Sequence, residues 1–553
     1  MKKRILTGLL GALAVFGLVS CGDAKNTTTS NPTPTTSVTP TPTSSKEPTP
    51  TASSDPTPTS STGDNPTPTS NTGYGDDPTP TSSLPTSTTT TTISEENKNF
   101  RTPEIVGPVD PSNVTLEKKH FDDYMKKNGP FAEDAFPSLG SPKFLVVPVS
   151  FDDTKKTSEL RSDIVKAFTG TAEDTGWESV KSYYEKSSYG KLTLDAEVTE
   201  WFTPSHNASY YETYYDEATD EDGSCLLVKE ALNHFDSTYD YSEYDYDEDG
   251  FIDSIWLIYN APVDYEEADF WWAYQTKTGY DDVWDGVKSS RYGFAGTDFM
   301  DPTKEELDYN TDSILVDAHT FIHESGHLMG LEDYYDYDTS KGPDNNMYGA
   351  DMMDANIGDH CSFNKLLLGW VDPTIATGDG LKEVSLHSFT ETGEFLLIAD
   401  HELETIYDEY FLIEFYTNTG LNKNDEPIIS DKDEDTGEII NEAMGIRIIH
   451  VDARLSLDRE GNVVDNGDSS YPGTGFIYDN SGTSKTLIEH LRADFGPNME
   501  EYLWPESLYT SESGVFGVDI WSTFKLNDGT SLIFTLKVKD IADGVCTFEI
   551  TLK

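Results

Sequence analysis

The chain has 553 residues, 35% hydrophobic and 12% aromatic, which is long and apolar enough for more than one folded domain. Its 100 acidic residues against 38 basic ones give a formal net charge of −62 at pH 7. Contacts to phosphate need Lys and Arg, so this balance argues against a nucleic acid partner. It suits a soluble surface, divalent cations or a salty medium.

The N-terminus is typical of an export signal. Three basic residues precede an apolar run from Ile5 to Val19, which is too short for a stable membrane-spanning helix and ends at small residues. The segment around Cys21 resembles a bacterial lipoprotein signal, and an ordinary secretory signal is the alternative. We therefore expect a signal peptide at residues 1–20 and a lipid on Cys21. The protein would lie at the extracellular face of the cell membrane, held by the lipid alone or released from it.

Residues 21–96 are low in complexity and rich in Pro, Thr and Ser, with a short unit that recurs, as in Asp55–Ser60 and Asn65–Ser70. The stretch has no apolar periodicity and hence no face to bury, so we expect a disordered, extended spacer. At about 3.1 Å per residue it would reach on the order of 200 Å when stretched. Such a spacer would hold a folded head away from the membrane.

Three cysteines remain beyond Cys21, at positions 225, 361 and 546. They are too few and too widely spaced for a disulfide framework. One disulfide and three free thiols both stay open for Cys225, Cys361 and Cys546. The oligomeric state is equally open.

The first folded part mixes strands and helices. Hydrophobic patterning predicts strands at 144–149, 192–202 and 255–259, and helices at 179–185 and within 314–330. We therefore expect an α+β catalytic domain at 97–375. Beyond Pro373 short strands dominate, at 395–398, 410–415, 446–451, 532–538 and 546–552, with turn signals between several of them. We expect a β-rich, sandwich-like C-terminal domain at 376–553.

An acidic loop at 245–253 has alternating aspartates and a glycine, as in a calcium loop of the EF-hand type. Alternate carboxylates can converge on one hard cation, whereas without it they would repel each other. The position where an EF-hand has its last glutamate holds Trp256, so a full EF-hand is excluded. The expected calcium ligands are Asp245, Asp247, Asp249, the carbonyl of Phe251, and Asp253.

The segment from His323 to Asp333 carries the strongest chemical signal. Two histidines four residues apart lie on one face of a helix, so His323 and His327 can reach one zinc ion. Glu324 follows the first histidine directly, which places its carboxylate where it can act as general base on a metal-activated water. Gly330 allows the chain to leave the helix in a conformation that other residues disfavour. The turn can then bring Asp333 to the metal as an oxygen ligand.

Other residues near this segment are alternatives. His319 lies one turn before His323 and could compete as a ligand, although packing near the start of the helix or support from outside the ligand set is the favoured interpretation. Asp336 and Asp338 are alternatives to Asp333, or could hold a structural cation.

A methionine-containing segment follows at 346–356. A turn with a methionine beneath the zinc ligands is typical of metzincin-like metallopeptidases, and Met353 is the expected residue, with Met352 second. His360 lies just beyond. It could stabilise the oxyanion of a tetrahedral intermediate, while a structural hydrogen bond is an equal alternative.

Beside the zinc helix, several stretches resemble the immune-inhibitor-A-type secreted metallopeptidases of bacteria. They are Ser182–Leu192, Leu328–Asp336, Phe363–Val371, Tyr410–Glu414 and Gly445–Asp452. The resemblance covers about 143–455. It implies zinc ligation by His323, His327 and Asp333, with Glu324 as the base, together with extracellular proteolysis and bound calcium. The chain differs from this family in that no sizeable folded propeptide is visible after the spacer. How the enzyme would be kept inactive before use therefore stays open.

The leading functional hypothesis is a surface-anchored zinc endopeptidase that hydrolyses proteins or peptides, with catalytic Zn²⁺ and structural Ca²⁺. A stalked adhesin or binding protein with a non-catalytic metal site is the alternative from another class. The intact Glu324 argues against it, because a structural zinc site needs no base. A zinc hydrolase that acts on a non-peptide substrate is a third hypothesis. The sequence does not specify the substrate or the cleavage specificity.

Overall fold

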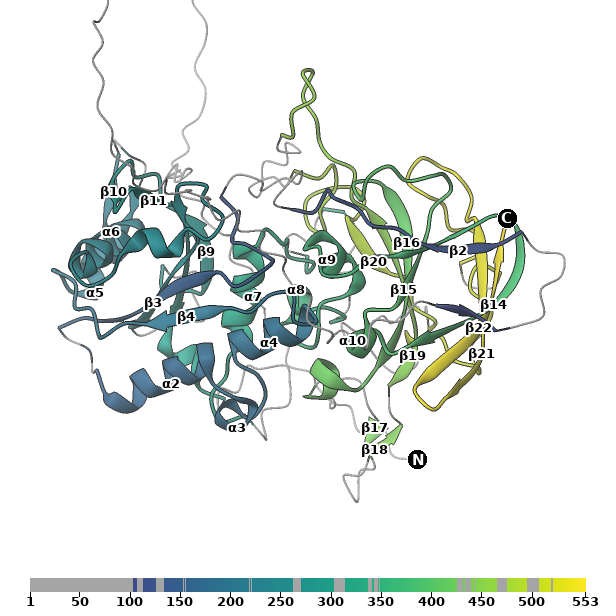
Figure 1. Ribbon diagram of the computed structural model, residues 1–553, viewed down its shortest axis with the longest axis horizontal. Coiled ribbons are helices and arrows are strands. Elements are labelled where there is room, and N and C mark those ends of the chain that lie inside the picture. Colours follow the sequence, from purple (N-terminus) through teal and green to yellow (C-terminus); the bar gives the residue numbers. More distant parts are fainter. Residues whose placement is uncertain are drawn as a thin grey trace, which may run out of the picture. The chain divides into compact units, whose positions relative to one another are not determined.

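Strand β3 (Lys143–Ser150) lies inside a five-stranded sheet with the order β4–β3–β8–β12–β9 (Figure 1). In this computed structural model, β3 pairs in parallel with β4 (Asp195–Val198) and β8 (Ile255–Asn260). Strand β12 (Arg291–Gly296) pairs in parallel with β8. The edge strand β9 (Tyr274–Lys277) runs antiparallel to β12.

The structure describes residues 103–553 except for 107–112, 126–133, 153, 155, 218, 220, 262–269, 303–313, 337–340, 343–346, 348, 425–430, 433–438, 442, 465–474, 495–506 and 519–520. The expected signal peptide, the lipidated Cys21, the spacer and Asp338 therefore lie outside the described residues.

Helices cover both faces of the five-stranded sheet, which explains why β3 is buried almost throughout. On β3, Phe144 and Val146 pack into one core with helices α2 (Ser158–Thr169), α4 (Val180–Ser187) and α7 (His319–Leu328). Leu145 and Val147 pack into a second core with α6 (Gly223–Phe235). Successive side chains of a strand point to opposite faces, so one apolar run supplies both cores.

Shorter elements connect these parts. They are α3 (Ala172–Thr175), α5 (Ala208–Thr213), β5 (Tyr215–Asp216), β6 (Glu221–Asp222), η1 (Tyr241–Tyr244), β7 (Phe251–Ile252), β10 (Val283–Trp284), β11 (Val287–Ser289), η2 (Thr297–Met300), α8 (Met352–Ala355), α9 (Ser362–Leu367), α10 (Phe389–Thr392), η3 (Gly420–Asn424), β17 (Asp431–Lys432) and β18 (Ile439–Asn441).

Two further sheets contain most of the later strands. The six-stranded sheet has the order β2–β13–β15–β16–β19–β20, with bounds Thr115–Lys118, Thr374–Thr377, Phe395–Ile398, Glu409–Thr417, Met444–Asp452 and Ile488–His490. The four-stranded sheet has the order β1–β14–β22–β21, with bounds Glu104–Ile105, Gly380–His387, Val545–Leu552 and Phe534–Ala542. Side chains of both sheets, such as Phe411 and Phe534, share a third hydrophobic core. We call residues 374–553 the C-terminal β region.

The sheets cross the domain boundary expected at residue 375. Strands β1 and β2 lie within the range expected for the catalytic domain, yet β1 pairs with β14 and β2 pairs with β13. The first core also contains side chains of β15, β16 and β19, for example Leu397 and Ile449. The two parts of the chain therefore share buried surface, and the expected domain limits remain predictions.

Mixed α/β structure is confirmed. The strand expected at 395–398 is β15 (Phe395–Ile398) without change, whereas the strand expected at 192–202 shrinks to β4. Cys225, Cys361 and Cys546 are each buried in a different core, which does not favour a disulfide among them. Among the described residues, no helix is long and apolar enough to cross a membrane.

Candidate active site

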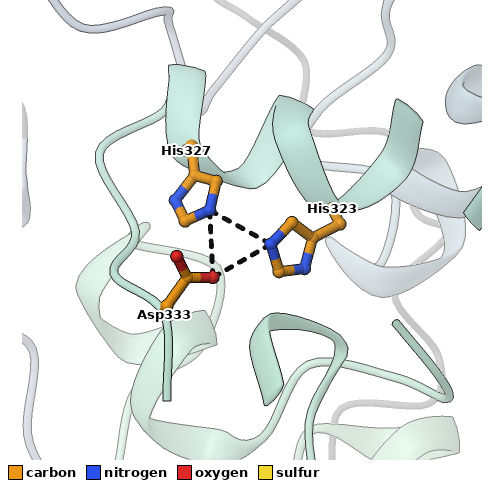
Figure 2. Close-up of side chains that lie close together, drawn as sticks. All are labelled: His323, His327 and Asp333. Carbon is orange, nitrogen blue, oxygen red and sulfur yellow. Dashed lines mark hydrogen bonds and ion pairs between the residues drawn. The ribbon is translucent and has the colours of Figure 1, made fainter. Parts of the chain in front are cut away.

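Helix α7 carries His323 and His327 one turn apart, and both side chains are buried. Their Nε2 atoms lie 3.1 Å apart. The Oδ1 atom of Asp333 lies 3.0 Å from Nε2 of His323 and 3.1 Å from Nε2 of His327 (Figure 2). Three atoms that can bind a metal thus form a nearly equilateral triangle.

Gly330 makes the turn that brings Asp333 back to the helix. Its φ of +101° lies in the left-handed region, where a side chain would strain the backbone. The Gly330 amide donates to His327 O at 2.9 Å, and the Leu331 amide donates to Gly326 O at 3.1 Å. These bonds satisfy carbonyls that the end of the helix would leave open. The glycine therefore has the role that the sequence predicts for it.

The hydrogen bonds of the two imidazoles fix where their protons are. Nδ1 of His323 lies 2.9 Å from Met352 O, and Nδ1 of His327 lies 2.8 Å from Leu331 O. A carbonyl oxygen can only accept, so each Nδ1 carries a hydrogen, and each ring in its neutral form presents a lone pair at Nε2. Two lone pairs and a carboxylate at this separation repel each other unless a positive charge lies between them.

A divalent metal fits this donor set. Tetrahedral ligands at about 2.0–2.1 Å from a zinc ion are about 3.3–3.4 Å apart, close to the separations found here. The pKa values agree with a strong attraction for positive charge. Burial opposes protonation of His327, but Asp333 outweighs it and raises the pKa of His327 to about 10. Burial likewise favours the neutral form of Asp333, but the two histidines outweigh it and hold the pKa of Asp333 well below its usual range.

Glu324 is a buried carboxylate next to the triangle, with 7% of its surface exposed. Within the described part of the chain, its Oε2 atom has no hydrogen-bond partner. Burial raises the pKa of Glu324, and His327 and His323 oppose this rise. An unpaired carboxylate oxygen in a buried site is costly unless another molecule uses it, and a water molecule that gives up its proton is suited to that position.

Met353 lies against α7 between the two histidines. A Cβ atom on Gly326 would lie 2.5 Å from Sδ of Met353, so glycine is needed for this close approach. The short helix α8 that carries Met353 is capped by Asp351, whose side chain accepts from Met353 N at 2.7 Å. The interpretation of Met353 as the methionine beneath the metal site remains a prediction.

His319 and Asp336 do not join the triangle. Among the described residues, the histidine and carboxylate group at this site consists of His323, His327 and Asp333. Nδ1 of His319 lies 2.8 Å from Asp317 Oδ1, and its ring stacks on Trp177 with centroids 3.9 Å apart. His319 thus packs at the start of α7, as the favoured interpretation has it.

His360 has no exposed surface. Its ring contacts those of Tyr183, Tyr184 and Trp370, and its Nδ1 lies 3.5 Å from Oδ1 of Asp351. Burial favours neutral Asp351, but His360 outweighs it and lowers the pKa of Asp351. This placement favours the structural alternative over a contact with the oxyanion of a substrate.

The acidic loop brings together carboxylates of Asp245, Asp247 and Asp253. Gly250 has a φ of +92°, which gives the sharp turn expected of it. Asp249 is outside this group, and its Oδ1 accepts from Phe251 N at 2.9 Å. Three of the expected calcium ligands are therefore close to one another, and the role of the Phe251 carbonyl remains a prediction.

Residues 162–356 match the model of the catalytic domain of immune inhibitor A peptidase M6. The chain carries a peptidase M6 domain of the immune inhibitor A type. The match includes the acidic loop, α7, Asp333 and Met353, and ends before His360.

Two curated proteins are similar to this chain in sequence. The pre-pro-metalloprotease PrtV of Vibrio cholerae serotype O1 is 28% identical over 179 residues, which are 29% of this chain and 19% of the relative. Immune inhibitor A of Bacillus thuringiensis subsp. alesti is 33% identical over 187 residues, which are 29% of this chain and 26% of the relative. The chain thus spans about a fifth to a quarter of the length of these relatives.

Proposed function

We propose that the protein is an extracellular zinc-dependent endopeptidase that cleaves protein or peptide substrates. The observation that carries this proposal is the triangle of His323, His327 and Asp333, beside which the Oε2 atom of Glu324 has no hydrogen-bond partner among the described residues. The M6 domain supports a metallopeptidase. Two imidazoles and one carboxylate are a ligand set that zinc prefers, and three protein ligands leave a position open for water or substrate.

The proposed mechanism divides the work between the metal and Glu324. A zinc ion held by the three ligands would polarise the scissile carbonyl and make water a stronger acid. Glu324 accepts the proton of the attacking water on its free carboxylate oxygen. It then passes this proton to the nitrogen of the leaving amine, so the same group acts first as base and then as acid. Burial of Glu324 helps the first step, because it favours the protonated form and so makes the carboxylate a better proton acceptor.

Further parts of the proposal concern the rest of the chain. We infer a metzincin-like site with Met353 beneath the metal, a structural calcium ion at Asp245, Asp247 and Asp253, and sandwich-like packing of the two later sheets. A lipid on Cys21 and the Pro/Thr/Ser-rich spacer would hold this head at the outer face of the bacterial membrane.

The experiment that tests the function uses casein and a peptide library with the purified protein. Cleavage should stop when a zinc chelator is added and return when zinc, but not magnesium, is restored. Cleavage that persists at full chelation would contradict the zinc mechanism. If the protein holds zinc and cleaves no peptide, the alternative of a stalked binding protein with a structural metal is favoured instead.

A further inference from the structure

The backbone of Tyr334, directly after the ligand Asp333, is held on both sides. Its amide donates to Met353 O at 2.9 Å. Its carbonyl accepts from Nδ2 of Asn480 at 3.0 Å. The carbonyl of the next residue, Tyr335, accepts from Oγ of Ser481 at 3.1 Å. Asn480 and Ser481 belong to the C-terminal β region, about 150 residues further along the chain and outside the matched M6 segment.

Asn480 is itself fixed in place. It is 3% exposed, and its side chain makes two more bonds to strand β20, from Nδ2 to Ile488 O at 3.0 Å and from Ile488 N to Oδ1 at 3.2 Å. The preceding Asp479 accepts from the amides of Ser481 and Thr483, which stabilises the turn. Both hydrogens of the Asn480 amide are donated. The bond to Tyr334 therefore connects the ligand loop to a sheet rather than to a loose side chain.

The same region also supports the loop beneath the metal site. Arg447 on β19 forms an ion pair with Glu414, its direct partner on β16, and Nη1 of Arg447 donates to Ala350 O. Ala350 lies two residues before Met352, whose carbonyl accepts from Nδ1 of His323. The contact of Asn480 with Tyr334 O connects the C-terminal β region to the segment that carries Asp333. The contact of Arg447 with Ala350 O connects it to the segment whose Met352 carbonyl binds His323.

We propose that Asn480 is a positioning residue for the metal site: through Tyr334 it fixes the backbone on which Asp333 reaches the metal. The inference rests on the proposed function. Asp333 lies on an irregular segment after α7, so its position is not set by helix or sheet hydrogen bonds of its own. When a metal binds a ligand on such a segment, ordering the segment costs conformational entropy, unless other contacts have already ordered it. Groups that orient ligands in this way are typically worth about 10–100-fold in metal affinity.

The test compares Asn480→Ala with Asn527→Ala in the full chain. Asn527 is a matched control, because its Nδ2 donates to Asp452 Oδ2 at 2.7 Å within the same region and not to the ligand loop. Zinc affinity is measured by competition with a chromogenic chelator, and the cobalt-substituted proteins are compared by their visible spectra. We expect Asn480→Ala to weaken zinc binding about 10–100-fold and to change the cobalt spectrum. At saturating zinc KM should stay unchanged. Asn527→Ala should keep the affinity and the spectrum of the wild type.

A milder variant covers the case in which Asn480→Ala does not fold. Ser481→Ala removes only the hydroxyl that donates to Tyr335, and should weaken zinc binding several-fold. The proposal is overturned if the folded variant binds zinc within twofold of Asn527→Ala and its cobalt spectrum is unchanged, even if its melting temperature falls. Failure of the proposed function shows differently, because the wild type itself would then bind no zinc or cleave no peptide.

Discussion

The Nε2 atoms of His323 and His327 face each other at 3.1 Å, although each ring already donates its Nδ1 hydrogen to a backbone carbonyl. Two lone pairs at this distance are stable only with a positive charge between them. Asp333 completes the set from outside the helix. The ligand geometry therefore depends on backbone bonds at Met352 and Leu331 as much as on the histidines themselves.

Asp333 should be essential for metal affinity and Asp336 should not. Asp333→Ala removes one of three ligands, so zinc should bind more than about 100-fold more weakly, beyond the loss typical of an outer contact. Asp336→Ala is a matched control, since both residues are 9% exposed and follow the same turn. Zinc competition titrations of both variants check this. Equal losses of zinc affinity in the two variants would contradict the assignment of Asp333, rather than Asp336, as the third ligand.

His450 should make the stability of the C-terminal β region depend on pH. The ring is 2% exposed, with Nε2 3.0 Å from Glu409 and Nδ1 2.8 Å from Glu489. Burial lowers its pKa, but the two carboxylates outweigh this and raise the pKa of His450 to about 9. The folded pKa is above the ordinary 6.5, so the stabilisation is full below pH 6.5 and is lost as the pH rises through 9.

The measurement for His450 is urea unfolding of the wild type and His450→Gln at several pH values. The free energy difference between them should shrink by up to about 3 kcal/mol from pH 6.5 to above pH 9. The comparison cancels other titrating groups that both proteins share. A difference that stays constant with pH would contradict the assignment.

Calcium should stabilise the protein through the acidic loop. A site at a hundred times its dissociation constant adds about 2.7 kcal/mol to the folded state, which raises the melting temperature by a few degrees. Asp247→Asn should abolish this gain. Glu248→Gln removes the same charge from the same loop outside the converging group and should keep it. Calorimetry with and without calcium decides this, and loss of the gain in both variants would mean general charge screening instead.

His360 should matter for stability more than for the chemical step. His360→Ala removes a buried ring from contact with Tyr183, Tyr184 and Asp351, and should cost about 2–4 kcal/mol of unfolding free energy. At saturating zinc, kcat should change less than about threefold. A loss of about 100-fold or more in kcat with unchanged stability is the pattern of an oxyanion contact, and would restore the catalytic interpretation.

The convergence of His323, His327 and Asp333 was predictable because its signals are local. The spacing of His323 and His327 follows from helix periodicity, and Gly330 marks where the helix ends. Strand β15 was predictable for the same reason, as four apolar residues with a turn signal nearby.

Other features depend on tertiary packing that no local pattern reveals. Strands β1 and β2 have two and four residues, too few for periodicity, and their partners lie more than 250 residues away. Asn480 is one asparagine in an irregular turn, and the sequence gives no signal for its contact with Tyr334. Asp351 could have been found as the cap before the Met352–Ala355 helix.

The most direct test of the central claim is the activity and zinc content of Glu324→Gln. This substitution keeps the size of the side chain and removes its ability to accept the proton. The variant should bind as much zinc as the wild type while its rate of casein cleavage falls by about 100- to 10,000-fold. Cleavage at the wild-type rate by a zinc-loaded Glu324→Gln protein would contradict the mechanism.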